Sequence, residues 1–228
     1  MVNRDSQGEP PRDLAVSAVD WTEAPDLVPY PEAVQTMERR VQGIREGSAR
    51  EWVWLVEHAP LYTAGTSADP SELLDANKLP VFQTGRGGRY TYHGPGQRIA
   101  YVMLDLGARG RDLRHYISNL EQWIIDTLET FGIRSDRREG RIGIWVDHNG
   151  QEKKIAALGV RVRHWVTFHG IAINVDPDLR QYQGIVPCGI ADHGVTSMAE
   201  LGVSVNMAEV DAALKAVFSG IFGGGVSG

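Results

Sequence analysis

Apolar side chains recur every three or four residues in three segments of the chain, the spacing expected on one face of an α-helix. The first segment spans residues 31–46 and the second spans residues 112–131, and glycine follows each of them. Glycine at that place is typical of a helix end. The third segment follows Asn206 and Glu209, which match an N-terminal capping box. The predicted apolar stripes are Val34, Met37, Val41 and Ile44; Leu113, Tyr116, Ile117, Leu120, Ile124, Leu128 and Phe131; and Val210, Leu214, Val217 and Ile221.

Short apolar runs predict the strands of a sheet. Two of these runs flank Asn149-Gly150, a dipeptide typical of a tight hairpin turn. The hairpin is therefore predicted from residues 142–146 and 154–163. The other predicted strands are residues 14–19, 52–56, 81–84, 99–106 and 169–175.

The segments between these elements are predicted as loops or single helical turns. Residues 58–65 and 86–97 are predicted as loops. Residues 71–77 are predicted as a short helix, and Ser197 with Glu200 as the capping box of another short helix.

Helices and strands alternate without a repeat, and a hairpin lies in the middle of the chain. This order predicts an α+β fold with a mixed β-sheet flanked by helices. Residues 13–222 are expected to form one domain, and the part after about residue 195 is long enough to form a small C-terminal subdomain. Residues 1–12 are expected to be a disordered leader and residues 223–228 a flexible tail.

The composition is typical of a globular protein in water, with 42% hydrophobic and 23% charged residues among 228. No apolar run is long enough to cross a bilayer, and the N-terminus lacks the apolar core of a secretory signal. A net charge of −6 argues against nucleic acid as the main partner. A single cysteine suits a reducing compartment, so we expect a cytoplasmic protein with no membrane contact.

The single cysteine, Cys188, stands between a proline and a glycine and is predicted to lie on a turn. A lone thiol is often a small buried apolar group. A thiol that acts as a nucleophile needs a group that stabilises its thiolate, and Lys154 could supply that charge. Most lysines at the end of a hairpin turn are solvated, as expected for Lys153, and Lys154 could be one of them.

Histidine is the other candidate base in this chain. His169, before a glycine, and His93, in the glycine-rich stretch, are better candidates than His115 or His148. No histidine pair has the spacing of a zinc site, and one cysteine cannot build a thiolate cluster. We therefore expect neither a metal nor a cofactor.

The stretch 86–97 has five glycines or prolines in twelve residues. It matches neither a phosphate-binding P-loop nor a dinucleotide fingerprint. It would let a ligand approach the backbone closely, although two turns with no ligand would explain it equally well.

Five motifs, in order over residues 52–200, resemble the octanoyltransferase family of lipoate biosynthesis. They are His58-x-Pro60-x-Tyr62-Thr63-x-Gly65, residues 86–97, residues 154–162, residues 168–175 and Pro187-Cys188-Gly189. The resemblance implies a fold like the catalytic domain of biotin and lipoate protein ligases. It also implies transfer of octanoyl from octanoyl–acyl carrier protein to a lysine of lipoyl domains, those of 2-oxoacid dehydrogenase E2 subunits and of the glycine cleavage H protein.

By the same resemblance, Cys188 matches the nucleophile that carries the acyl group as a thioester, and Lys154 matches the lysine that lowers its pKa. Three segments match those that line the acyl pocket of the family. Their residues are Arg86, Gly87, Gly88, Arg89, Tyr90, Thr91, Tyr92 and His93; Ala157, Leu158 and Gly159; and His169, Gly170, Ile171 and Ala172.

Three other functions remain open from the sequence. A lipoate–protein ligase would use ATP and need no catalytic cysteine. A thiol hydrolase would pair Cys188 with His169 or His193 and release the free acid. A binding module would hold acyl chains or lipoyl domains without turnover. The transferase is favoured because the thiol and the lysine fall in two separate matching motifs.

Overall fold

The computed structural model describes residues 18–186 and 194–223. The predictions for the leader, for most of the strand at residues 14–19, for Cys188 and for His193 lie outside these residues. The first described strand is β1, Asp20–Glu23, which follows the run predicted as a strand. Within the described residues no helix is long and apolar enough to cross a membrane.

The three predicted long helices are confirmed in the described part of the chain: α1 (Tyr30–Glu46), α2 (Leu113–Glu129) and α3 (Met207–Phe222). α1 ends at Gly47, whose φ of 73° is left-handed. α2 begins where the Asp112 side chain accepts a hydrogen bond from the His115 N–H. α3 has the predicted capping box between Asn206 and Glu209.

The described residues form an eight-stranded mixed sheet in which β1, β2, β6, β10, β9, β8 and β7 lie in that order, and β11 also pairs with β9. β1 runs parallel to β2 and β11 parallel to β9, whereas the other pairs are antiparallel. The predicted α+β class with a mixed sheet is therefore confirmed. The bounds are β2 (Trp52–Val56), β6 (Gln97–Met103), β7 (Asp136–Arg138), β8 (Arg141–His148), β9 (Gln151–Arg163), β10 (Val166–Asn174) and β11 (Gly194–Val195).

A second, three-stranded sheet has the order β4 (Val81–Gln83), β3 (Leu61–Ala64) and β5 (Tyr90–His93) among the described residues. β3 and β5 pair in antiparallel register and fall in the two stretches that were expected to be loops. The loop prediction is wrong there because each strand is only four residues long and is ordered by its distant partner.

Two predicted short helices differ from the structure. Residues 71–77 contain only the single 3₁₀ turn η1, Pro70–Glu72. Ser197 Oγ accepts a hydrogen bond from Glu200 N–H at 3.1 Å, as the capping box predicted, but the residues that follow form a turn. A second 3₁₀ segment, η2 (Leu179–Gly184), precedes residue 187.

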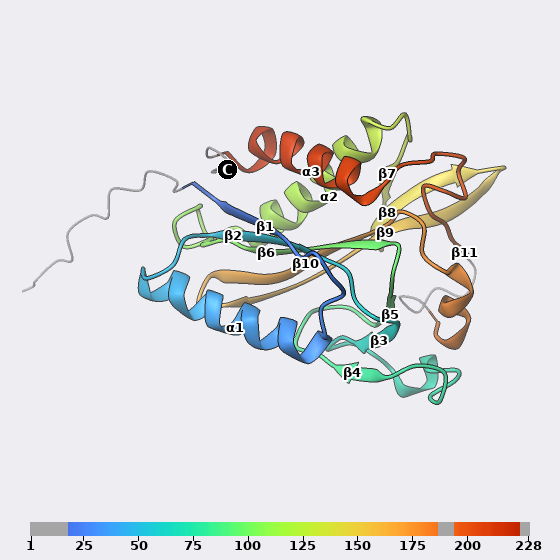
Figure 1. Cartoon of the computed structure of the whole chain (residues 1–228), viewed down its shortest axis with the longest axis horizontal. Helices are drawn as coiled ribbons and strands as arrows, with labels where there is room; N and C mark the ends of the chain where they lie inside the picture. Colours follow the sequence, from blue (N-terminus) through green and yellow to red (C-terminus); the bar gives the residue numbers. More distant parts are fainter. Residues whose placement is uncertain (1–17, 187–193, 224–228) are drawn as a thin grey trace, which may run out of the picture.

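Helices cover both faces of the main sheet (Figure 1). α1 lies on one face, and α2 and α3 lie on the other. β6 contributes Ala100 and Val102 to the α2–α3 side and Ile99, Tyr101 and Met103 to the α1 side. Because both faces are covered, the central strands β2, β6 and β10 are buried at every position.

Candidate active site

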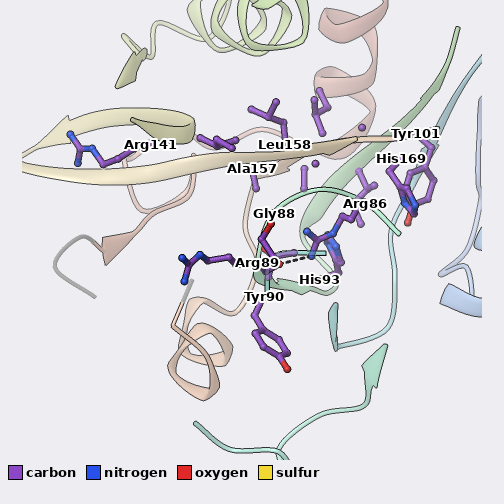
Figure 2. A pocket seen from close by; sticks show the side chains of 18 of the residues that line it. Arg86, Gly88, Arg89, Tyr90, His93, Tyr101, Arg141, Ala157, Leu158 and His169 are labelled. Atoms are coloured by element: carbon purple, nitrogen blue, oxygen red, sulfur yellow. Dashed lines mark hydrogen bonds between the residues drawn. The ribbon is translucent and has the colours of Figure 1, made fainter. Parts of the chain in front are cut away.

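A cavity of about 350 Å³ opens on the α1 face of the main sheet, beside the small sheet. Strands β9 and β10, strand β5 and the glycine-rich stretch before β5 form its walls. Figure 2 shows Arg141 at one end of the cavity and Tyr101 with His169 at the other.

The floor of the cavity is made of small residues on paired strands. Gly159 of β9 pairs with Gly170 of β10, and Ala157 pairs with Ala172. A Cβ atom at Gly170 would lie 2.2 Å from the Ala100 carbonyl oxygen, so only glycine allows β10 to approach β6 there. The floor therefore leaves space that larger side chains would fill.

Leu158 and Ile171 also border the cavity, but their side chains pack with the α2–α3 core. Side chains alternate across a strand, so neighbours of Ala157, Gly159, Gly170 and Ala172 must point the other way. The predicted pocket segments thus contribute backbone at these two positions.

Arg86 holds the glycine-rich stretch in place. Its guanidinium is buried and donates to Thr63 O at 2.9 Å, Thr63 Oγ1 at 2.7 Å, Gly87 O at 2.9 Å and Arg89 O at 3.0 Å. Gly87 N–H donates to Val160 O at 2.9 Å, which fastens the same stretch to β9. These bonds fix the loop that borders the cavity (Figure 2).

His93 is a neutral, buried part of the cavity wall. Burial, followed by unfavourable electrostatic interactions with His58, Arg86 and His169, lowers its pKa from 6.5 to about 3, in spite of the hydrogen bond to Gln97. Its Nδ1 donates to Gln97 Oε1 at 2.7 Å, so Nε2 faces the Thr63 hydroxyl at 3.4 Å as an acceptor. His93 is therefore fixed in one tautomer and is a poor general base.

His169 is also neutral at ordinary pH. Burial, followed by the charges of Arg86 and Arg161, lowers its pKa to about 3. Its φ of 60° is left-handed, a conformation in which histidine is tolerated better than bulky or β-branched residues. The ring lies edge-on to Tyr101 at 6.2 Å between centroids.

Lys154 is only 6% exposed, whereas most lysines at the end of a hairpin turn are solvated. Its Nζ lies 5.3 Å from the centroid of the Trp145 ring. Thr196 N–H donates to the Lys154 carbonyl oxygen at 2.9 Å. The structure therefore gives Lys154 a defined, buried position.

A bulge on β9 decides which face Lys154 occupies. Ile144 pairs with Ala156, but Trp145 pairs with Lys154, so Ile155 is an extra residue. Both Ile155 and Ala156 pack in the α2–α3 core. Two consecutive side chains therefore point to the same face of the sheet at the bulge, and the usual alternation of faces resumes on either side of it.

Lys154 consequently lies on the same sheet face as Ala157 and the cavity. Gly143, with a φ of 122°, makes room for its stem, because a Cβ there would lie 2.3 Å from Lys154 Cε. Arg141 borders the cavity, and its Cζ lies 4.8 Å from the centroid of the same Trp145 ring. Lys154 is thus a neighbour of the Arg141 end of the cavity and does not itself line it.

Most predicted pocket residues line the cavity: Arg86, Gly88, Arg89, Tyr90, Thr91, His93, Ala157, Leu158, Gly159, His169, Gly170, Ile171 and Ala172. Gly87 and Tyr92 do not. Gly87 faces Val160, and the Tyr92 ring packs against Tyr62 and Tyr182 in the small-sheet core.

The remaining lining residues were not predicted from the sequence; they are Tyr30, Ser67, Ile99, Tyr101, Gly140, Arg141 and Ile142. Tyr30 stands immediately before a predicted helix and Tyr101 lies in a predicted strand, and neither was predicted to border a pocket. Gly140, Arg141 and Ile142 border the cavity because β7 and β8 turn back there. No local motif marks them.

Within residues 18–186 and 194–223, no three His, Cys, Asp or Glu side chains come together as a metal site. The chemistry of the described site therefore consists of Lys154, the buried Arg86 cation and two neutral histidines.

A family model described as "Lipoyl protein ligase A/B catalytic domain" matches residues 29–219. An octanoyltransferase from Paramagnetospirillum magneticum is 61% identical over 206 residues, which cover 90% of this chain and 97% of the relative. An octanoyltransferase from Brucella melitensis is 57% identical over 222 residues, which cover 93% of this chain and 84% of the relative.

Solved structures share the fold at low sequence identity. A lipoate protein ligase from Thermoplasma acidophilum superposes with a TM-score of 0.68 and 17% identity, covering 92% of this chain and 85% of that one. A lipoate-protein ligase A crystallised with ATP gives 0.69 and 16%, covering 92% and 87%. These structures support the predicted ligase-like catalytic fold.

Proposed function

The chain belongs to the lipoyl protein ligase A/B catalytic-domain family and is an acyltransferase related to octanoyltransferases, and from this premise we propose its reaction. It transfers an octanoyl group from octanoyl–acyl carrier protein to one lysine of a lipoyl domain. Cys188 carries the octanoyl group as a thioester between the two half-reactions. The acceptors are lipoyl domains of 2-oxoacid dehydrogenase E2 subunits and the glycine cleavage H protein.

The observation that carries this proposal is the position of Lys154. A lysine that is 6% exposed on the cavity face of a sheet is unusual unless the charge has a function or a partner. Along the chain, residues 187–193 are followed directly by β11, in which Val195 pairs with Lys154. Cys188 is therefore seven residues along the chain from the strand partner of Lys154, which supports the assignment of the two as a catalytic pair.

The chemistry balances without a cofactor or ATP. The Cys188 thiolate attacks the thioester carbonyl, the carrier-protein sulfur leaves and takes a proton from Lys154, and an octanoyl thioester forms on Cys188. The lysine amine of the lipoyl domain then attacks that thioester and forms an amide, its proton passes to the now neutral Lys154, and the Cys188 thiolate leaves. Lys154 stabilises the thiolate as a cation in both half-reactions.

The cavity suits an eight-carbon chain. Its floor at Ala157, Gly159, Gly170 and Ala172 carries little side chain, and apolar residues such as Ile99 border it. His93 and His169 are neutral, so they do not place charge against the acyl chain. We assign the acyl chain to this cavity, with its carbonyl toward the Arg141 and Lys154 end.

A transfer assay tests the proposed function. Octanoylation of an apo lipoyl domain is followed by mass spectrometry with two donors, octanoyl–acyl carrier protein without ATP and octanoate with ATP. We expect transfer from the carrier protein alone. Modification only with octanoate and ATP would identify a ligase, free octanoate without modified acceptor would identify a hydrolase, and neither product would identify a binding module; each contradicts the proposal.

A further inference from the structure

A buried asparagine lies outside the cavity and outside the proposed catalytic pair. Asn174, the last residue of β10, is 3% exposed. Its Nδ2 donates to the Thr196 carbonyl oxygen at 2.9 Å. Its Oδ1 accepts from Gln97 Nε2 at 2.9 Å and from the Tyr182 hydroxyl at 3.2 Å. One side chain therefore joins three segments that are distant in sequence.

Two of these segments stand on either side of residues 187–193 in the chain. Tyr182 belongs to η2, which precedes them. Thr196 follows β11, which begins directly after them. Asn174 therefore fixes the described elements that flank Cys188 in sequence to the same point at the end of β10.

The same side chain is two hydrogen bonds away from the backbone of Lys154. Thr196 accepts from Asn174 through its carbonyl oxygen, and its own N–H donates to the Lys154 carbonyl oxygen at 2.9 Å. Among the described residues, β11 pairs with β9 only at Gly194 and Val195. Such a short strand gains little from its own ladder, so the Asn174 bond matters for its position.

On its other side Asn174 connects to the cavity wall. Gln97, which donates to Asn174, also donates to the Tyr182 hydroxyl at 3.0 Å and accepts from His93 Nδ1 at 2.7 Å. Every member of this network is less than 9% exposed. Hydrogen bonds in such surroundings are strong and fix geometry, because water cannot replace a lost partner.

We propose that Asn174 is a positioning residue for octanoyl transfer. Through Thr196 it fixes the pairing of β11 with the Lys154 backbone. Through Gln97 and Tyr182 it fixes the position of these paired strands relative to η2 and the cavity wall. The inference rests on the proposed function for the roles of Lys154 and Cys188, and the hydrogen bonds are independent of it.

Asn174→Asp tests the inference with a side chain of nearly the same shape. The aspartate keeps an acceptor for Gln97 and Tyr182 but places an oxygen against the Thr196 carbonyl, which repels it. Two quantities are measured: kcat and KM for octanoyl–acyl carrier protein, and the pH profile of iodoacetamide alkylation of Cys188, the only cysteine in the chain.

We expect kcat to fall roughly tenfold or more, because a displaced lysine is misaligned with the reacting atoms. KM should change less than about threefold. The alkylation midpoint should move up toward the ordinary thiol value of about 8.5, because the lysine charge supports the thiolate less well. Two other charged groups are unchanged by the substitution: Arg141, whose Cζ lies 4.8 Å from the Trp145 ring centroid, and Glu200, which lies 3.6 Å from Lys153 Nζ.

Thr127→Val is the matched control. Thr127 is 1% exposed on α2, and its Oγ1 donates to Trp123 O at 2.7 Å, away from this network. The control should lower the melting temperature while leaving kcat and the alkylation profile unchanged. A purely structural role for Asn174 would give the same pattern as the control.

Tyr182→Phe removes a single hydroxyl of the network and is the second test variant if Asn174→Asp fails to fold. Its kcat and the midpoint of its Cys188 alkylation profile should shift in the same directions as in Asn174→Asp, by smaller amounts. The inference is overturned if the folded variant keeps the wild-type alkylation profile and kcat. That outcome leaves the wild-type enzyme active, whereas failure of the proposed function would show as a wild-type protein without octanoyl transfer.

Discussion

Lys153 and Lys154 are adjacent on β9, yet their side chains point to opposite faces of the strand. Lys153 Nζ lies 3.6 Å from the Glu200 carboxylate, in a partly exposed ion pair. Lys154 is buried beside Trp145 on the cavity face. Two identical side chains in consecutive positions thus have different surroundings, and they form a natural pair for comparison.

We expect Lys154→Met to lower the rate of octanoyl transfer roughly 100-fold or more, because the thiolate loses its cationic partner. Lys153→Met should keep the rate within about threefold, because exposed ion pairs contribute little. Initial rates of lipoyl-domain octanoylation at saturating donor measure both. Equal rates for the two variants would remove Lys154 from the mechanism.

His169 makes stability depend on pH. Its pKa is about 3 in the folded chain and about 6.5 when unfolded, so below pH 6.5 the unfolded chain binds more protons. Stability therefore falls as the pH falls from 6.5 toward 3. This residue alone should remove about 2 kcal/mol of unfolding free energy between pH 7 and pH 5.

His169→Asn removes this titration and tolerates the left-handed φ of residue 169. Urea unfolding at pH 7 and pH 5 should therefore show a smaller loss of stability in the variant than in the wild type. Asp211, whose pKa is raised to about 6, acts with the opposite sign but is the same in both proteins. An identical loss in both would contradict a buried neutral His169.

At the scale of elements, the β8–β9 hairpin separates what sequence can predict from what it cannot. Asn149-Gly150 predicted the turn, and the structure has a two-residue turn with φ of 55° and 73° between the paired residues His148 and Gln151. The bulge at Ile155 was not predicted, because consecutive apolar residues carry no sign of the face they occupy. That bulge places Lys154 on the cavity face.

α3 is held against the main sheet by a buried ion pair as well as by apolar contacts. Arg98 of β6 and Asp211 of α3 approach within 2.7 Å, and both are 5% exposed. Burial raises the Asp211 pKa to about 6 in spite of Arg98, so the carboxylate is costly to bury. The pair joins elements that are more than 100 residues apart in the chain.

We expect Asp211→Ala to lower the free energy of unfolding by about 3 kcal/mol or more, because the Arg98 guanidinium remains buried without its carboxylate. Replacing both residues, with Arg98→Met and Asp211→Leu, should recover most of that loss. Urea unfolding of both variants at pH 7 measures the difference. A double variant as unstable as Asp211→Ala would mean that the loss comes from repacking of α3 and not from the unpaired charge.

For the whole molecule, the three long helices, the central strands and the α+β class followed from local patterns, because each has a periodicity or a cap. The pairing of Leu61–Ala64 with Tyr90–His93 did not, because four-residue strands depend on distant partners. The cavity was predictable only where motifs marked it. Tyr30, Tyr101 and Arg141 join it through tertiary folding of segments that carry no motif.

The central claim is a covalent octanoyl thioester on Cys188, and intact mass tests it most directly. The protein is incubated with octanoyl–acyl carrier protein, without ATP or acceptor, and then with apo lipoyl domain. We predict a mass increase of one octanoyl group that maps to Cys188, is absent in Cys188→Ser and disappears as the lipoyl domain becomes octanoylated. The account would be contradicted if Cys188→Ser octanoylated the lipoyl domain at the wild-type rate and neither the wild-type enzyme nor the variant carried an octanoyl adduct.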